Sequence, residues 1–166
     1  MIGIFRKIIL MSVTLGLFAI PAQAQTKFEN THSLEGLKEA RVYFDVSVKD
    51  DDLLAVRMEL IDRTVTQIEQ AGLKVTGVIG IRGGASRFIT TGDSYVLAEE
   101  LDNKRKIQQW VKRFADRGLL VEQCAIAAEI FDIQTTDFLP EVTVVGNGYI
   151  SLVGYQAKGY SVVPMD

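Results

Sequence analysis

Apolar residues recur along the chain in two alternating patterns, short continuous runs and runs with a helical period. The run at 41–48 is rich in β-branched and aromatic residues and predicts a strand. Behind it, apolar residues lie three and four positions apart, which is typical of an amphipathic helix, and Gly72 is a fitting end for that helix. Its apolar positions are Leu54, Met58, Ile61, Val65 and Ile68. The next apolar run, 73–81, predicts a strand that is covered on both faces.

The same alternation continues toward the C-terminus. Further strands are expected at 119–124, 142–145 and 160–163, and further helices at 103–117, 125–131 and 149–158. Each strand is followed by a helix before the next strand, which favours parallel pairing through right-handed crossovers. We therefore expect an α/β fold: a three-layer α/β/α sandwich around a five-stranded, mainly parallel sheet.

The first 24 residues have the pattern of a secretory signal peptide. A basic start with Arg6 and Lys7 precedes an apolar stretch at 8–20, and Ala22-Gln23-Ala24 fits a small-residue cleavage site. The apolar stretch is short for a bilayer span, and an uncleaved anchor is the alternative. We expect cleavage after residue 24, a flexible polar leader at 25–40 and one domain at 41–166. This predicts a periplasmic or secreted protein with no membrane attachment after cleavage.

Charge and histidine content narrow the possible functions. The chain has 18 basic and 21 acidic residues, and the predicted signal peptide holds basic residues but no acidic one. The mature chain is therefore acidic, which argues against a nucleic-acid partner. The single histidine, His32, lies in the predicted leader, so a histidine-rich metal site and a Cys-His hydrolase are both excluded. We expect no metal and no organic cofactor.

Cys124 is the strongest candidate for chemistry. It ends the predicted strand at 119–124 and opens the helix at 125–131, which places it at the carboxyl edge of the sheet, where open α/β sheets bind ligands. A helix N-terminus favours the thiolate, which is the nucleophilic form of cysteine. We expect partial exposure in a crevice, with the loop at 132–140 long enough to lie over the thiol. The alternative is an inert cysteine that fills the core as a small hydrophobe.

A second candidate site lies where the strand at 73–81 ends. Arg82, Gly83, Gly84 and Arg87 combine glycines, which let backbone N–H groups approach an anion, with two guanidinium groups. These residues are candidates for binding an anion or stabilising the thiolate. The alternative is a tight turn with solvated arginines. The Lys-Ser/Thr pair and the spacing of a phosphate-binding P-loop are missing.

Several short motifs, in this order and spacing, resemble the DsrE/DsrF-like family, whose members include small sulfur-relay proteins. They are Phe44-Asp45-Val46, Gly83-Gly84-Ala85, the segment from Cys124 to Ala128, Asp137-Phe138-Leu139-Pro140-Glu141-Val142-Thr143-Val144-Val145, Asn147-Gly148 and Gly159-Tyr160. The resemblance implies a five-stranded α/β/α fold, homo-oligomers such as trimers or hexamers, and a cysteine, here Cys124, that carries persulfide sulfur.

Two functions from different classes follow. The first is a sulfur carrier that takes up and passes on sulfane sulfur through Cys124, with at most a sulfurtransferase-like activity. The second is a non-catalytic oligomeric module that binds a small anion or a partner protein, with Cys124 as core filler. The sequence indicates neither the sulfur donor nor the acceptor.

Overall fold

The computed structural model describes residues 30–166, and the predicted signal peptide and the leader up to residue 29 lie outside this part. Its centre is a five-stranded sheet in the order β4-β3-β2-β1-β5, and all four strand pairs are parallel. The strands are β1 (Glu39–Val46), β2 (Lys74–Ile81), β3 (Leu120–Cys124), β4 (Val142–Val145) and β5 (Ser161–Met165). The α/β fold class is confirmed, and the mainly parallel sheet is entirely parallel.

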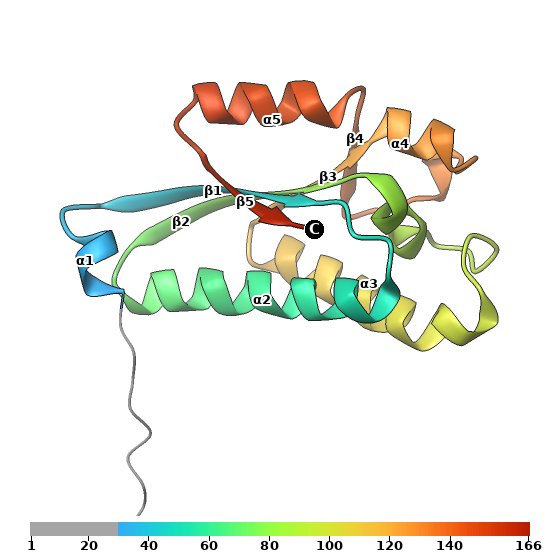
Figure 1. The fold of residues 1–166 in the computed structure, drawn as a ribbon, viewed down its shortest axis with the longest axis horizontal. Coiled ribbons are helices and arrows are strands. Elements are labelled where there is room, and N and C mark those ends of the chain that lie inside the picture. The colour runs from blue at the N-terminus through green and yellow to red at the C-terminus, as the bar shows by residue number, and fades with distance from the viewer. Residues whose placement is uncertain (1–29) are drawn as a thin grey trace, which may run out of the picture. The chain divides into compact units, whose positions relative to one another are not determined.

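Helices cover both faces of the sheet, as Figure 1 shows. Two long helices lie on one face, and α5 lies on the other with the short α4 at its end. The helices are α1 (Thr31–Leu34), α2 (Asp51–Gln70), α3 (Leu101–Asp116), α4 (Ala125–Ile130) and α5 (Gly148–Ala157). Short 3-10 helices are η1 (Gly83–Ile89), η2 (Ala98–Glu100) and η3 (Thr135–Asp137). None of the helices within residues 30–166 has the length and apolarity that crossing a membrane requires.

Local sequence signals explain where α2 begins and ends. The Asp50 side chain accepts a hydrogen bond from the Leu53 N–H at 2.9 Å and so satisfies one free donor of the first turn. The chain leaves the helix through Gly72, whose φ of 87° is in the left-handed region that glycine adopts without strain. The predicted apolar positions Leu54, Met58 and Ile61 are fully buried.

The two faces of the sheet differ in polarity, and this difference positions the site. Alternate residues of a strand point to opposite faces. On β1, Phe44 belongs to the apolar core with α2 and α3, whereas Tyr43 contacts Tyr155 of α5 and Asp45 binds Arg82, which contacts Tyr149 of α5. On β3, Val121 joins the apolar core and Glu122 lies under α5. The face under α5 therefore carries titratable strand residues, whereas Phe44 and Val121 point into the apolar core.

The loop at 132–140 does not bond to the thiol that it was expected to cover. Its hydrogen bonds tie it to the end of η1 and to the segment that follows: Leu139 N–H donates to the Ile89 carbonyl at 3.0 Å, and Thr91 N–H donates to the Asp137 carbonyl at 2.7 Å. The Tyr95 hydroxyl donates to the Asp137 carboxylate at 2.6 Å. Two chain segments without regular strands are thus held together beside the sheet.

Candidate functional site

Cys124 is placed at the carboxyl edge of the sheet, as predicted. It is the last residue of β3 and the N-cap residue of α4, and its strand partner is Val145 at the end of β4. Because consecutive strand residues alternate between faces, Cys124 lies on the same face as Glu122, under α5. The thiol therefore belongs to the polar face of the sheet.

The sulfur of Cys124 is bound by the first residue of α5. The Gly148 N–H donates to Sγ over 3.2 Å. Asn147 caps the helix by accepting a hydrogen bond from Tyr149 N–H at 2.9 Å, so that the Gly148 N–H is left for the sulfur. The N-terminal end of a helix carries a partial positive charge, and here that end meets the sulfur.

The expectation that Cys124 is partly exposed is wrong, because its exposed fraction is 4%. The cause is the close approach of α5. An added Cβ on Gly148 would lie 3.1 Å from Cys124 Cβ and 3.5 Å from its Sγ, so glycine is what lets the helix reach the sulfur. The start of α5 therefore both binds and covers the thiol.

Arg82 follows β2 at the same edge of the sheet, and its guanidinium is engaged by Asp45. Nε and Nη2 donate to the two carboxylate oxygens of Asp45 at 2.8 and 2.7 Å, a bidentate pair. This hydrogen bonding raises the pKa of Arg82. The third nitrogen, Nη1, lies 3.4 Å from the Tyr149 hydroxyl, and the guanidinium carbon lies 4.9 Å from the centre of the Tyr149 ring. Through Tyr149, Arg82 borders the residue that binds the sulfur.

The other three residues of the predicted anion site, Gly83, Gly84 and Arg87, make packing or polar contacts within the chain. Gly83 has a φ of 60°, and an added Cβ on Gly84 would lie 2.4 Å from Lys49 Cβ, so both glycines serve the packing of η1 against the chain after β1. Arg87 is 3.6 Å from Glu100 and 3.5 Å from the Lys49 carbonyl. Within residues 30–166, neither arginine has a hydrogen bond to Cys124, and anion binding by this segment stays a prediction.

Sequence reasoning missed a polar cluster under α5. The Glu122 carboxylate accepts hydrogen bonds from the hydroxyls of Ser151 and Tyr155, the latter at 3.0 Å. Burial and then the bond to Glu122 raise the pKa of Tyr155 to about 12. Burial, followed by the charges of Glu122 and Asp45, also raises the pKa of Tyr43. The signal in the sequence was a glutamate in the middle of a strand expected to be buried.

Gln123 occupies the other face of β3, beside the thiol. Its Nε2 donates to Ser86 Oγ and to the Cys124 carbonyl, both at 2.8 Å. Its Oε1 is buried without a hydrogen-bond partner among the described residues. Gln123 thus fixes the backbone of Cys124 to η1.

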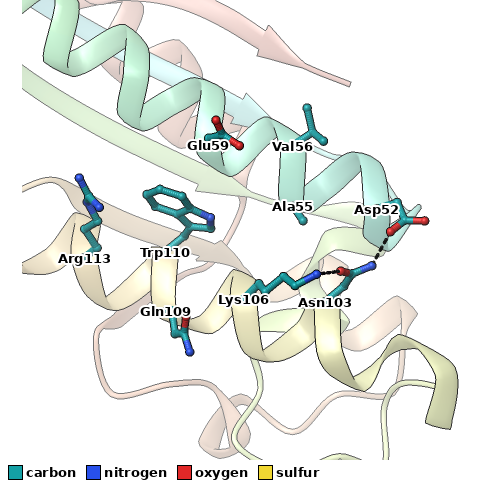
Figure 2. A pocket seen from close by; sticks show the side chains of 9 residues that line it. All are labelled: Asp52, Ala55, Val56, Glu59, Asn103, Lys106, Gln109, Trp110 and Arg113. Atoms are coloured by element: carbon teal, nitrogen blue, oxygen red, sulfur yellow. Dashed lines mark hydrogen bonds between the residues drawn. The ribbon is translucent and has the colours of Figure 1, made fainter. Parts of the chain in front are cut away.

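A groove between α2 and α3 lies on the opposite face of the sheet, and Figure 2 shows its lining. Ala55, Val56 and Trp110 form its apolar part. Asn103 donates to Asp52 at 2.7 Å, which joins the two helices at one end. Since the sheet separates this groove from α5, it takes no part in the Cys124 site. Residues 30–166 contain no cluster of side chains suited to a metal ion.

Comparisons with known proteins place the fold but not the activity. No family model matches the chain. An uncharacterized protein of Aquifex aeolicus (strain VF5) is 27% identical over 125 residues, which is 75% of this chain and 55% of that protein. The chain thus spans about half the length of this curated relative. A solved structure of a protein of unknown function, MTH1491, from Methanobacterium thermoautotrophicum has a TM-score of 0.61 at 15% identity, covering 76% of this chain and 99% of that one. This likeness shows a shared fold.

Proposed function

We propose that this chain is a DsrE/DsrF-like sulfur carrier that holds sulfane sulfur on Cys124. Three observations support the proposal: the motifs that resemble the family, the fold shared with MTH1491, and a cysteine at the carboxyl edge of a parallel sheet. The observation that carries the proposal is the 3.2 Å contact between the Gly148 N–H and the sulfur, because a helix N-terminus stabilises the thiolate that such chemistry needs.

The proposed reaction is a thiol exchange. The Cys124 thiolate attacks the outer sulfur of a donor persulfide, a bond forms between Sγ and that sulfur, and the sulfur–sulfur bond of the donor breaks. The donor leaves as a thiolate, and Cys124 becomes a persulfide. No external oxidant or reductant takes part, because the sulfane sulfur moves as a unit. A second exchange of the same kind passes it to an acceptor thiol.

Access to the thiol requires a local opening, since Cys124 is buried by the start of α5. Tyr149 is the residue best placed to move, because it is 59% exposed and, among residues 30–166, its hydroxyl is held by one long contact of 3.4 Å with Arg82. Displacing Tyr149 also frees Nη1 of Arg82 at the same edge of the sheet. An anionic sulfur donor could then accept a charge-assisted hydrogen bond from this nitrogen.

We also propose the setting in which the carrier works. The signal-peptide pattern supports export to the periplasm or beyond, and the family resemblance supports a trimer or hexamer. N-terminal sequencing of the exported protein tests the first point, with Gln25 expected as the first residue.

Intact-mass spectrometry tests the carrier function directly. The protein, reduced and then incubated with polysulfide, is expected to gain about 32 Da per chain, one sulfur atom. A reductant should remove this mass, and Cys124→Ser should never acquire it. A reduced wild-type thiol that takes up no sulfur from several donors contradicts the proposal.

The second candidate is a non-catalytic binding module, and the burial of Cys124 favours it. An inert cysteine buried beside a helix reacts with an alkylating reagent only after denaturation, whereas a carrier thiol that opens locally is labelled in the native protein near neutral pH. The rate of labelling with and without urea separates the two candidates.

A further inference from the structure

Glu122 is a buried carboxylate that lacks a positively charged partner. Its exposed fraction is 5%, and within residues 30–166 no lysine or arginine forms an ion pair with it. The guanidinium of Arg82, at the end of the neighbouring strand, is paired with Asp45. Burying a carboxylate is costly unless it is paired or hydrogen-bonded, and apolar residues would fill the same volume at less cost. A glutamate at this position therefore calls for an explanation.

Both hydrogen-bond donors to Glu122 come from α5. Ser151 and Tyr155 are four residues apart, so they lie on the same side of the helix, one turn from each other. Ser151 reaches one carboxylate oxygen and Tyr155 reaches the other. A carboxylate held at both oxygens by two successive turns fixes the position of the helix along β3 as well as its rotation.

Besides these bonds, α5 is held by the Tyr155 ring, which lies 5.6 Å from the ring of Tyr43 on β1, and by the contact of Tyr149 with Arg82. Gly148 is its only buried residue, and several of its apolar side chains point to solvent. The bonds of Ser151 and Tyr155 to Glu122 lie within two turns of the Gly148 N–H that binds the sulfur. A hydrogen bond to sulfur weakens when its donor turns or slides away, so the position of α5 decides whether Cys124 keeps its donor.

We infer that Glu122 is the positioning residue of the Cys124 site: it holds α5 so that the Gly148 N–H meets the sulfur. The inference rests on the proposed function only in so far as Cys124 acts as a thiolate. Glu122 and Cys124 are two residues apart on one strand, so the anchor and the sulfur keep a fixed spacing. Glu122 acts through the helix and does not touch the sulfur donor.

The direction in which a variant shifts the ionisation of Cys124 separates positioning of α5 from the direct effect of the Glu122 charge. Glu122→Gln removes a negative charge near the sulfur, which by itself makes the thiolate easier to form. Loss of the Gly148 N–H makes it harder to form. Ser151→Ala and Tyr155→Phe remove one donor each without removing the carboxylate, and the response of the Gly148 amide then shows whether the helix has moved. The other titratable groups on this face are Tyr43 and Asp45 from β1, Arg82 just after β2, and Tyr149 and Tyr155 from α5. The helix that follows Cys124, α4, carries Glu129.

NMR titration of the reduced full chain measures the effect without any sulfur donor. Because the chain has one cysteine, labelling cysteine Cβ gives a single resonance that follows ionisation. In Ser151→Ala and Tyr155→Phe, we expect the midpoint of this titration to rise by about one pH unit, a tenfold change in the equilibrium. In the wild type we expect the Gly148 amide resonance to shift with the ionisation of the thiol that it binds, and in these variants we expect it to lose most of that response.

Two matched controls define the outcome. Tyr160→Phe removes a hydroxyl from the ring that meets Tyr155 edge-on and has no bond to Glu122, and Glu129→Gln removes an exposed carboxylate from α4. Neither should raise the midpoint. An unchanged or lowered midpoint in folded Ser151→Ala and Tyr155→Phe, with the Gly148 response intact, overturns the inference. If these midpoints rise but the wild type takes up no sulfur, the carrier function fails and the positioning role stands.

Discussion

At the scale of single residues, glycines decide how closely α5 approaches the sheet. Gly148 lets the helix start touch Cys124, and on β2 an added Cβ on Gly80 would overlap the Tyr43 hydroxyl at 1.8 Å. Each glycine therefore makes room for a functional or polar side chain of a neighbouring element. A methyl group at either position has no space unless α5 or Tyr43 moves.

Gly148→Ala is expected to lower the free energy of unfolding by about 1 kcal/mol, because overpacking against Cys124 outweighs the helix preference of alanine. The matched control is Gly154→Ala on the same helix, where an added Cβ meets no atom within 4 Å. This control should stabilise the protein by about 1 kcal/mol, since alanine favours a helix interior over glycine. Urea unfolding of the two variants measures both effects. Equal shifts of the same sign would contradict the close approach at Gly148.

Tyr155 makes stability depend on alkaline pH. Its pKa is raised to about 12 in the folded protein, above the ordinary value of about 10, so the folded state favours the neutral phenol. This contribution is fully present below about pH 10 and is lost as the pH rises from there through the folded-state pKa. We expect the free energy of unfolding to fall less steeply above pH 10 in Tyr155→Phe than in the wild type. Urea unfolding at several alkaline pH values reads the difference, and parallel curves would refute it.

At the scale of elements, α2 and α3 are joined by a charged cluster. Asp62 on α2 is buried and accepts hydrogen bonds or ion pairs from Arg113, at 3.1 Å, and from Arg117. Arg117 also reaches Glu69 at 2.7 Å. The cluster fixes the end of α3 against α2 and lies on the face of the sheet away from Cys124.

Asp62→Ala is expected to lower the free energy of unfolding by about 2 kcal/mol, because it leaves the partly buried Arg117 without its closest partner. The value is set below that for a fully buried pair, since solvent reaches part of the cluster. Asp102→Ala serves as the control, because it breaks an exposed pair with Arg105 and should change stability by less than about 0.5 kcal/mol. Urea unfolding compares them. The assignment fails if Asp62→Ala is as mild as the control.

Elements with their own local signals were predictable, and contacts between distant elements were not. The apolar period, the Asp50 cap and Gly72 lie within or beside α2, so its extent could be predicted from the sequence. The thiol at the end of β3 was placed correctly for the same reason. Its burial was missed because the residue that covers it, Gly148, comes from a different helix. The role of Glu122 was missed on the same ground, since both of its donors lie in α5.

At the scale of the whole molecule, α5 exposes an apolar surface. The helix contains no charged residue, and Ile150 and Val153 are 70% and 63% exposed. On the adjoining α4, Ile126 and Ile130 are exposed as well. Contiguous apolar side chains on a surface mark a site of association, and interfaces of permanent homo-oligomers are the most apolar ones. This surface is our candidate for the contact within the proposed trimer or hexamer.

The double variant Ile150→Asp, Val153→Asp is expected to convert the oligomer to a monomer, because two buried charges without partners destabilise an apolar interface. Val56→Asp is the control: it places the same charge at a half-exposed valine on α2, at the groove shown in Figure 2. Light scattering at micromolar concentration measures the mass of each protein. A wild type that already has the mass of one chain removes the prediction.

The position of β1 inside the sheet has a consequence for how the chain is completed. One neighbour of β1 is β2, made soon afterwards, and the other is β5, so that Val42 pairs with Ser161. Because synthesis runs from the N-terminus, β1 is made early, and one of its edges stays unpaired until β5, near the end of the domain, has been made. Open strand edges recruit other chains, and distant pairings form slowly. Ribosome-bound or truncated chains that lack β5 should therefore aggregate more readily and depend more on chaperones than the full chain.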